Sequence, residues 1–508
     1  MAVTTLAVPR RKDIASLPEL RGFGAQLNTF VFTRTGSFTR MDQAQDLTDA
    51  QLRSLRAAID GLRPGHCRIF VQRGLNPDSE KSRSAPGFVA LVKTLELAQH
   101  AGANVNLTWW GQGPYALKAR LRELDWPNRN VRKWPQRHLR KWPTALTDPD
   151  GPGGMPGPRE KVERFARIIH ELRKRFDCVT HATIQNEPNG DGSDLAQQGV
   201  PHLSMRLYER LYRDFDAALR RLPDPQSPDR SLREAITIVA GDLLQEGKSK
   251  ADHQDEWIRY MHANMERPRP GFESVLDAYS IHVYWTPAEF PSKLERRLES
   301  LDALLRGLGS TKPVFVTEYG VRKLVRPASM RPGMIGGVNL DHTTDAAFQH
   351  AWFNALAPQC RCAGLAKWVM YRTDIVSGWG IWGLIDAPSR RFEKSPAYHV
   401  TRLFNDLLGP GWTADGMSRS ADRAILVSRF SAPRRADESL VALNSGDGAR
   451  EVRITGLPRS RRFQRASWNV DGEGTVERPR PLTSSSGGAL TLAIPRRGFV
   501  ALSTRRPT

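Results

Sequence analysis

The sequence predicts an α/β protein that consists of a (β/α)8 TIM barrel at residues 1–410 and a C-terminal β-sandwich domain at residues 411–508. Up to residue 410, short apolar runs alternate with helical patterns, which is typical of parallel strands joined by helices. Beyond it, short alternating runs recur at intervals of roughly ten residues with turn residues between them, which is typical of a small all-β domain. A chain of 508 residues is also too long for a single compact core.

Eight apolar runs are the expected barrel strands. They are residues 21–32, 65–72, 103–110, 179–186, 235–243, 276–285, 312–320 and 364–372. Eight strand–helix units favour a closed parallel barrel over an open doubly wound sheet. A dinucleotide-binding open sheet would carry a glycine-rich turn after its first strand, and GFGAQLN at residues 22–28 does not fit G-x-G-x-x-G.

The segments between these runs show apolar residues at helical spacing. Residues 46–62 are one example, in which Thr48 and Gln51 are expected to form a capping box at the helix start. The apolar stripe of this helix consists of Leu52, Leu55, Ile59 and Leu62. Similar patterns at 160–176, 205–222, 292–309 and 396–411 predict further helices around the barrel.

Composition excludes some classes of protein. No apolar run approaches the ~18–20 residues of a membrane span, and the first 20 residues lack the apolar core of a signal peptide. We therefore expect a protein that stays in the cytoplasm or one whose signal is missing from this sequence. The four cysteines are expected to be buried thiols, and no Cys/His spacing resembles a zinc site.

The formal net charge of +21 allows a polyanionic partner, such as a nucleic acid or an acidic polysaccharide. The basic residues are dispersed along the chain rather than gathered into one stripe. We therefore expect no nucleic-acid partner. An acidic glycan remains open, and Arg73 and Arg372 follow barrel strands where they would face such a ligand.

Polar residues stand where the apolar runs end. Because the C-terminal ends of barrel strands meet at one mouth, these side chains are expected to converge. They are Arg68, Asn186, Glu187, His282, Tyr284, Glu318 and Trp368. Glu187 and Glu318 are far apart in the sequence, and only closure of the barrel would bring them together.

The residues Asn-Glu-Pro at 186–188, His-x-Tyr at 282–284 and Thr-Glu-Tyr-Gly at 317–320 resemble the clan of retaining (β/α)8 glycoside hydrolases that includes families five, thirty and thirty-nine. Arg68 and Trp368 also match the pattern of that clan. The resemblance implies that Glu187 is the acid/base and Glu318 the nucleophile, and that Asn186 donates to the sugar 2-hydroxyl. It also implies that no metal or organic cofactor is needed.

Retaining hydrolysis requires two carboxyl groups about 5 Å apart, one ionised and one protonated. Arg68 and the Tyr284 hydroxyl are the expected partners that keep Glu318 ionised. Since indole stacks well on the C–H faces of sugars, Trp110 and Trp285 are the expected sugar platforms. His282 is either a supporting residue of the site or a structural histidine.

These residues predict a hydrolase that cleaves an oligo- or polysaccharide through a glycosyl-enzyme intermediate. A transglycosylase would use the same residues and differ in how well the site admits water. Proteins of another class, which bind carbohydrates or polyanions without catalysis, are the further alternative, although the presence of both glutamates argues against them.

Overall fold

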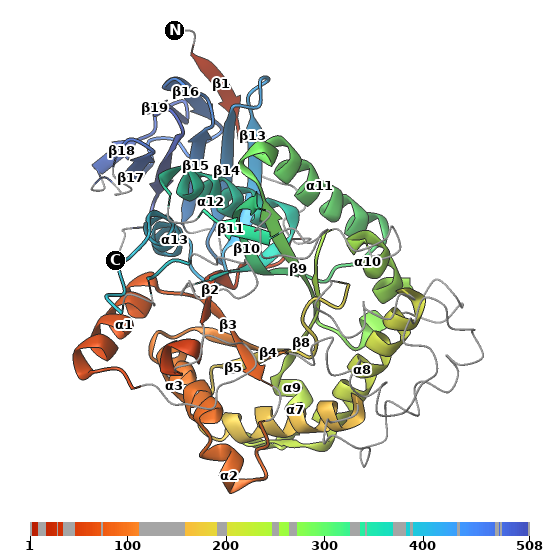
Figure 1. Cartoon of the computed structure of the whole chain (residues 1–508). Coiled ribbons are helices and arrows are strands. Elements are labelled where there is room, and N and C mark those ends of the chain that lie inside the picture. Colours follow the sequence, from red (N-terminus) through yellow and green to blue (C-terminus); the bar gives the residue numbers. More distant parts are fainter. Residues whose placement is uncertain are drawn as a thin grey trace.

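In the computed structural model, the described residues are 3–8, 17–27, 29–33, 46–72, 75–110, 158–189, 201–245, 253–263, 272–325, 336–340, 343–368, 383–386, 390–433, 437–472, 477 and 480–505. Eight parallel strands close into a barrel in which each strand pairs with its neighbours and the last pairs with the first (Figure 1). In order around the barrel, the strands are β2 (Gly22–Leu27), β3 (His66–Gln72), β4 (Asn104–Trp110), β5 (Val179–Thr183), β8 (Thr237–Leu243), β9 (Ala278–Trp285), β10 (Val314–Val325) and β12 (Cys362–Trp368). The eight expected strands are thereby confirmed.

Helices surround this barrel on its outer side (Figure 1). The longer ones are α1 (Asp49–Leu62), α3 (Pro86–His100), α7 (Pro158–Arg173), α8 (Pro201–Arg221), α10 (Gln254–Ala263), α11 (Ser292–Gly307), α12 (Thr344–Leu356) and α13 (Pro396–Leu407). The short helices α2 (Glu80–Arg83) and α9 (Leu232–Ala235), the hairpin of β6 (Pro223–Asp224) and β7 (Ser227–Ser231), and β11 (Gly336–Asn339) lie in the connections. The expected capping box is present, since the Gln51 N–H donates to Thr48 Oγ1 and the Thr48 N–H donates to Gln51 Oε1.

Two sheets make up the C-terminal region. The larger sheet has the order β13 (Thr413–Arg419), β14 (Ile425–Ser431), β15 (Glu438–Asn444), β20 (Gly498–Ser503), β17 (Arg462–Asn469) and β18 (Arg480–Thr483). The smaller sheet contains β1 (Thr4–Ala7), β16 (Arg450–Thr455) and β19 (Ala489–Ile494). An apolar cluster that includes Leu6, Ile425, Leu440, Val452 and Leu492 joins the two sheets as a sandwich.

The N-terminal strand belongs to this sandwich rather than to the barrel. The sequence analysis assigned residues 1–410 to the barrel, but β1 pairs in parallel with β16. Figure 1 shows it in red among the blue C-terminal strands. The segment before the first barrel strand and the segment after the last barrel helix therefore both belong to the sandwich. The boundary near residue 410 stays a prediction.

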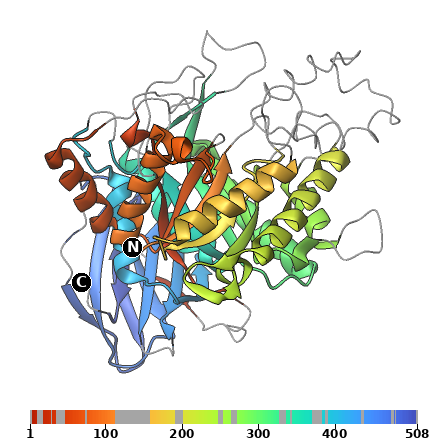
Figure 2. The ribbon, with the colours of Figure 1, turned by 90° about the horizontal axis from the view of Figure 1, so that it is seen from below.

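The sandwich packs firmly on one flank of the barrel (Figure 2). The larger sheet is buried on both faces, because alternate residues such as Leu426 and Leu443 join the apolar core that also contains the barrel helices. Across this interface Phe499 of β20 contacts Phe404 of α13 edge-on, with ring centroids 6.3 Å apart. The buried Glu295 carboxylate of α11 accepts from Arg423 at 2.7 Å. Among the described residues, no helix is long and apolar enough to cross a membrane.

Candidate active site

A β-bulge in β10 places two successive side chains inside the barrel. Val316 pairs with Ile281 and Glu318 with His282, which makes Thr317 the extra residue. A bulge breaks the strict alternation of a strand and can re-aim a side chain. Thr317 Oγ1 accordingly donates to the buried Asp242 Oδ1 at 2.6 Å, while Glu318 accepts from Arg68 and Tyr284.

A second irregularity, at the end of β8, aims Asp242 inward. Ala240 pairs with Tyr279 and Leu243 with Ile281, so Gly241 and Asp242 together oppose the single residue Ser280. Gly241 has a φ of 134°, and a Cβ there would lie 2.1 Å from the Ser280 carbonyl oxygen, so only glycine fits. The Asp242 N–H donates to Ser280 Oγ at 2.6 Å, and Asp242 itself has a left-handed φ of 49°.

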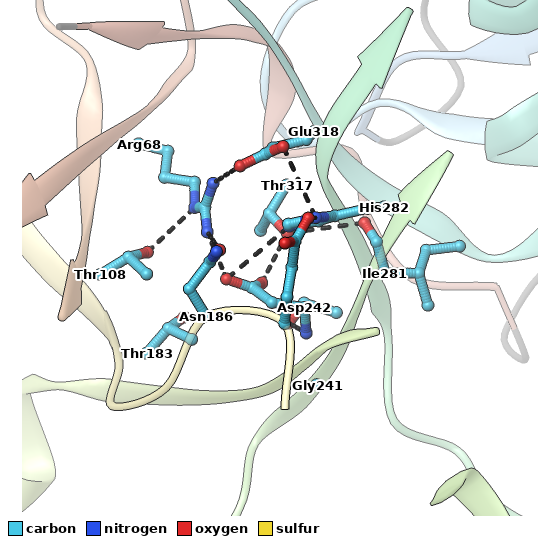
Figure 3. Close-up of polar contacts among 12 residues, drawn as sticks. Arg68, Thr108, Thr183, Asn186, Gly241, Asp242, Ile281, His282, Thr317 and Glu318 are labelled. Atoms are coloured by element: carbon cyan, nitrogen blue, oxygen red, sulfur yellow. Dashed lines mark hydrogen bonds and ion pairs between the residues drawn. The ribbon is translucent and has the colours of Figure 1, made fainter. Parts of the chain in front are cut away.

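Arg68 of β3 is the centre of the polar network (Figure 3). Its side chain is completely buried, and its five hydrogen bonds go to residues of other barrel strands and the β5 end. Nε donates to Thr108 Oγ1 at 3.0 Å, Nη1 to Gln26 Oε1 at 2.9 Å and Glu318 Oε1 at 2.5 Å, and Nη2 to Asn186 Oδ1 at 2.6 Å and to Asp242 Oδ2. Burial alone would lower the pKa of Arg68, but the carboxylates of Asp242 and Glu318 outweigh it and raise the pKa above its ordinary value.

The two glutamates lie face to face. One carboxylate oxygen of Glu187, Nδ1 of His282 and one carboxylate oxygen of Glu318 all lie within 4.8 Å of one another. Closure of the barrel thus brings the two glutamates together, although they are far apart in the sequence. Glu187 follows β5 and has a left-handed φ of 44°, a backbone conformation that costs free energy for a residue other than glycine.

The surroundings of the two carboxylates differ. Glu318 accepts from the Arg68 guanidinium at 2.5 Å and from the Tyr284 hydroxyl at 2.9 Å, and its side chain is 7 % exposed. Glu187 accepts from His282 Nδ1 at 2.9 Å, and its side chain is 27 % exposed. Glu318 is thus held by a permanent cation, as a nucleophile requires, whereas Glu187 is more open to solvent and to a leaving group.

His282 links the two glutamates. Its buried ring lies with Nδ1 2.9 Å from Glu187 Oε1 and 3.5 Å from Glu318 Oε2. Nε2 lies 3.9 Å from Asp242 Oδ2. Burial alone would lower the pKa of His282, but Glu318 first, then Glu187 and Asp242, raise the pKa above its ordinary value. His282 is therefore part of the site.

Among the described residues, Glu187, His282 and Glu318 are the one group with three potential metal-ligand atoms close together. All three side chains take part in hydrogen bonds between protein groups: Nδ1 of His282 bonds to Glu187, and Glu318 accepts from Arg68 and Tyr284.

Trp285 requires a correction, since the sequence analysis expected it to form a sugar platform. Its indole is 2 % exposed, stacks on Phe353 with centroids 5.2 Å apart, and donates from Nε1 to Gln349 Oε1 at 2.8 Å. Trp285 alternates with Tyr284 along β9 and faces the helices, so it offers no face to a ligand. The side chains of Trp110 and Trp368, as well as Arg73 and Arg372, lie outside the described residues.

The sequence analysis did not identify Asp242, Thr317 and Gln26 as members of the site. The sequence did contain a signal for Asp242, because it is an acidic residue at the end of the apolar run 235–243. Glu318 stands in a similar position in the run 312–320 and was identified for that reason. Asn186, which was expected, accepts from Arg68 through Oδ1. This contact leaves the Nδ2 donors of Asn186 directed away from the guanidinium.

No family model matches the chain, and no curated protein matches it. Solved structures do match over nearly the whole chain. A family 30 endoxylanase from Clostridium papyrosolvens C71 superimposes with a TM-score of 0.56 at 13% identity, covering 99% of both chains. The catalytic domain of the family 30 xylanase C from Talaromyces cellulolyticus has a TM-score of 0.58 at 11% identity, covering 98% of this chain and 99% of the other.

A family 39 glycoside hydrolase from Bacteroides cellulosilyticus WH2 has a TM-score of 0.53 at 15% identity, covering 96% of this chain and 81% of the other. At such identities the similarity establishes the fold. The chain therefore shares the fold of the two family 30 structures, a (β/α)8 barrel with a β-rich C-terminal region.

Proposed function

We propose that the protein is a retaining glycoside hydrolase that cleaves a β-linked, or equivalently oriented, oligo- or polysaccharide. The observation that carries this proposal is the pair of carboxylates, Glu187 and Glu318, within 4.8 Å of each other at the end of the barrel strands. Solved structures with the same fold include xylanases, which adds support.

In the first step, Glu318 attacks the anomeric carbon while Glu187 gives its proton to the leaving oxygen, and the glycosidic bond breaks. The Arg68 guanidinium and the Tyr284 hydroxyl hold Glu318 in its ionised form and fix the position of its oxygens. The Nδ2 group of Asn186 donates to the sugar 2-hydroxyl beside the reacting carbon.

In the second step, Glu187 takes a proton from water, the water oxygen attacks the anomeric carbon, and the ester bond to Glu318 breaks. Formation of the ester removes the negative charge of Glu318, which had favoured the protonated form of Glu187. Glu187 therefore remains a carboxylate after giving up its proton and can act as the base, provided that neighbouring groups stabilise its charge. The hydrogen bond from His282 provides that stabilisation.

Trapping of the covalent intermediate tests the proposal. A panel of activated 2-deoxy-2-fluoro-glycosides with different sugars should label wild-type protein, and peptide mass spectrometry should place the label on Glu318. Glu318→Gln should lose the label. Glu187→Gln should retain labelling when the leaving group is activated, because such a group leaves without a proton.

Glu209→Gln is a matched control, because Glu209 also accepts from a tyrosine hydroxyl, that of Tyr260 at 2.9 Å, but lies on α8 outside the barrel. It should label like the wild type. Labelling of a residue other than Glu318, or no labelling together with no hydrolysis of any glycan tested, would contradict the proposed function.

A further inference from the structure

We propose that Asp242 is a positioning residue of the candidate active site, which fixes the Arg68 guanidinium by a hydrogen bond and acts on the nearby His282 ring through its charge. This inference rests on the proposed function. Asp242 is completely buried, so it acts on the site through its neighbours and not through the ligand.

The contacts of Asp242 reach the residues that flank both glutamates. Oδ2 accepts from Nη2 of Arg68, whose Nη1 donates to Glu318. The same oxygen lies 3.9 Å from Nε2 of His282, whose Nδ1 donates to Glu187. Asp242 is thus connected to Glu318 by hydrogen bonds through Arg68 (Figure 3), whereas its influence on His282 acts through charge over 3.9 Å.

The backbone around Asp242 is shaped to hold it there. The left-handed φ of Asp242 and the bulge at Gly241 carry a conformational cost that an ordinary strand end would avoid. Oδ1 of Asp242 accepts from Thr317 Oγ1 at 2.6 Å, and Tyr208 from α8 accepts from the Gly241 N–H at 2.7 Å. A buried carboxylate held by so many contacts is pre-organised rather than incidental.

The charges of the site explain why a third carboxylate is useful. Arg68 is a single cation that two carboxylates, Asp242 and Glu318, share. Without Asp242, the Nη2 group would keep Asn186 as its acceptor but lose its ion pair, and the guanidinium would shift towards its remaining carboxylate, Glu318. Because a misplacement of about 1 Å can cost about 100-fold in rate, the loss should appear in the chemical step.

The charged and titratable groups that face Asp242 come from four elements. They are Arg68 of β3, His282 of β9, Glu318 of β10, and Tyr208 and Tyr212 of α8. Burial would raise the pKa of Asp242, but Arg68 and then His282 outweigh it and lower the pKa, so Asp242 is ionised at neutral pH. Since Asp242 helps to raise the pKa of His282, its removal should lower the His282 pKa.

The test compares Asp242→Asn with the wild type by two measurements. The first is the rate at which the activated fluoro-glycoside traps the protein. The second is the pH titration of the His282 ring by NMR in protein labelled with 13C at histidine Cε1, with the signal assigned through His282→Gln. We expect trapping about 100-fold slower, a KM for a substrate changed much less than kcat, and a lower His282 titration midpoint.

Asp415→Asn is the matched control. Asp415 is completely buried in β13, accepts from Ser431 Oγ at 2.6 Å, and lies 3.8 Å from the buried Arg429 Nε, but it belongs to the sandwich. It should leave both readouts unchanged. If Asp242→Asn does not fold, Thr317→Val tests the proposal instead, because it removes one hydrogen-bond donor from Asp242 without changing a charge. We expect Thr317→Val to be trapped about tenfold more slowly than the wild type.

Each outcome has one meaning. A folded Asp242→Asn protein with wild-type trapping and wild-type His282 titration overturns the proposal, as does a Thr317→Val protein that is trapped at the wild-type rate when Asp242→Asn is unfolded. If the wild type itself is never trapped, the proposed function fails. The His282 titration, which needs no ligand, then still decides whether Asp242 controls the ring.

Discussion

Substitution Arg68→Met removes the cation of the site while keeping most of the stem of the side chain. Two ionised carboxylates, Asp242 and Glu318, then lose their buried partner. Breaking one buried ion pair costs about 3–5 kcal/mol. The neutral acceptors Thr108, Gln26 and Asn186 also lose a donor, but their polar groups can re-pair at a total cost of about 1 kcal/mol. We expect a loss of about 4–6 kcal/mol in the free energy of unfolding at pH 7.

The loss should depend on pH in a defined direction. In the wild type, the lowered pKa of Asp242 means that its contribution to stability is present above its unfolded value of 3.8 and disappears only as the pH falls through the folded value. In Arg68→Met, burial is no longer outweighed, so the pKa of Asp242 rises and the carboxylate takes a proton more readily. The destabilisation should therefore shrink between pH 7 and pH 5.

Urea unfolding followed by circular dichroism at both pH values measures this effect. Arg68→Lys is the companion variant, because a lysine retains the charge but has three donors in place of the five hydrogen bonds that Arg68 makes. It should be less destabilised than Arg68→Met. Wild-type stability of Arg68→Met at pH 7, or a loss that grows on acidification, would refute the reasoning.

Two further predictions concern His66 and Trp285. His66 is buried, no described residue partners its ring nitrogens, and burial first and Arg68 second lower its pKa to about 3. Its neutral form is thus favoured in the fold, so stability should fall by about 2–3 kcal/mol from pH 6.5 to pH 4.5. The Tm of His66→Phe should fall less than that of the wild type between pH 6.5 and pH 4.5. An equal fall in both proteins would contradict the role given to His66. Trp285→Phe should lower the free energy of unfolding by about 1–3 kcal/mol, because Gln349 Oε1 loses its donor. The KM for a glycan should stay at the wild-type value. A large rise in KM would mean that Trp285 contacts the ligand.

The barrel could be predicted because its strands are buried on both faces. Such strands appear as continuous apolar runs, and the polar residues that end them, such as Glu187 and Glu318, mark the mouth. The sandwich strands could be predicted for a different reason, because short alternating runs with turn residues between them recur beyond residue 410.

Other features depend on contacts that the sequence does not reveal. The pairing of β1 with β16 brings a segment near the start of the chain into the C-terminal sandwich. The four residues of β1 are too few to show a pattern that would predict this pairing. Thr317 reaches Asp242 only because a bulge interrupts the alternation of β10. For Trp285, alternation along β9 was informative: it follows Tyr284, which faces Glu318, and therefore points to the helices.

The stereochemical course of hydrolysis tests the central claim most directly. Proton NMR can follow the anomeric signal of the first sugar released from an aryl glycoside before mutarotation. In an inverting enzyme, the two carboxyl groups are about 6.5–9.5 Å apart, because the attacking water molecule must fit beside the sugar. Glu187 and Glu318 are too close together for that arrangement. We predict that the product first appears with the anomeric configuration of the substrate, and an initial product of opposite configuration would contradict the account.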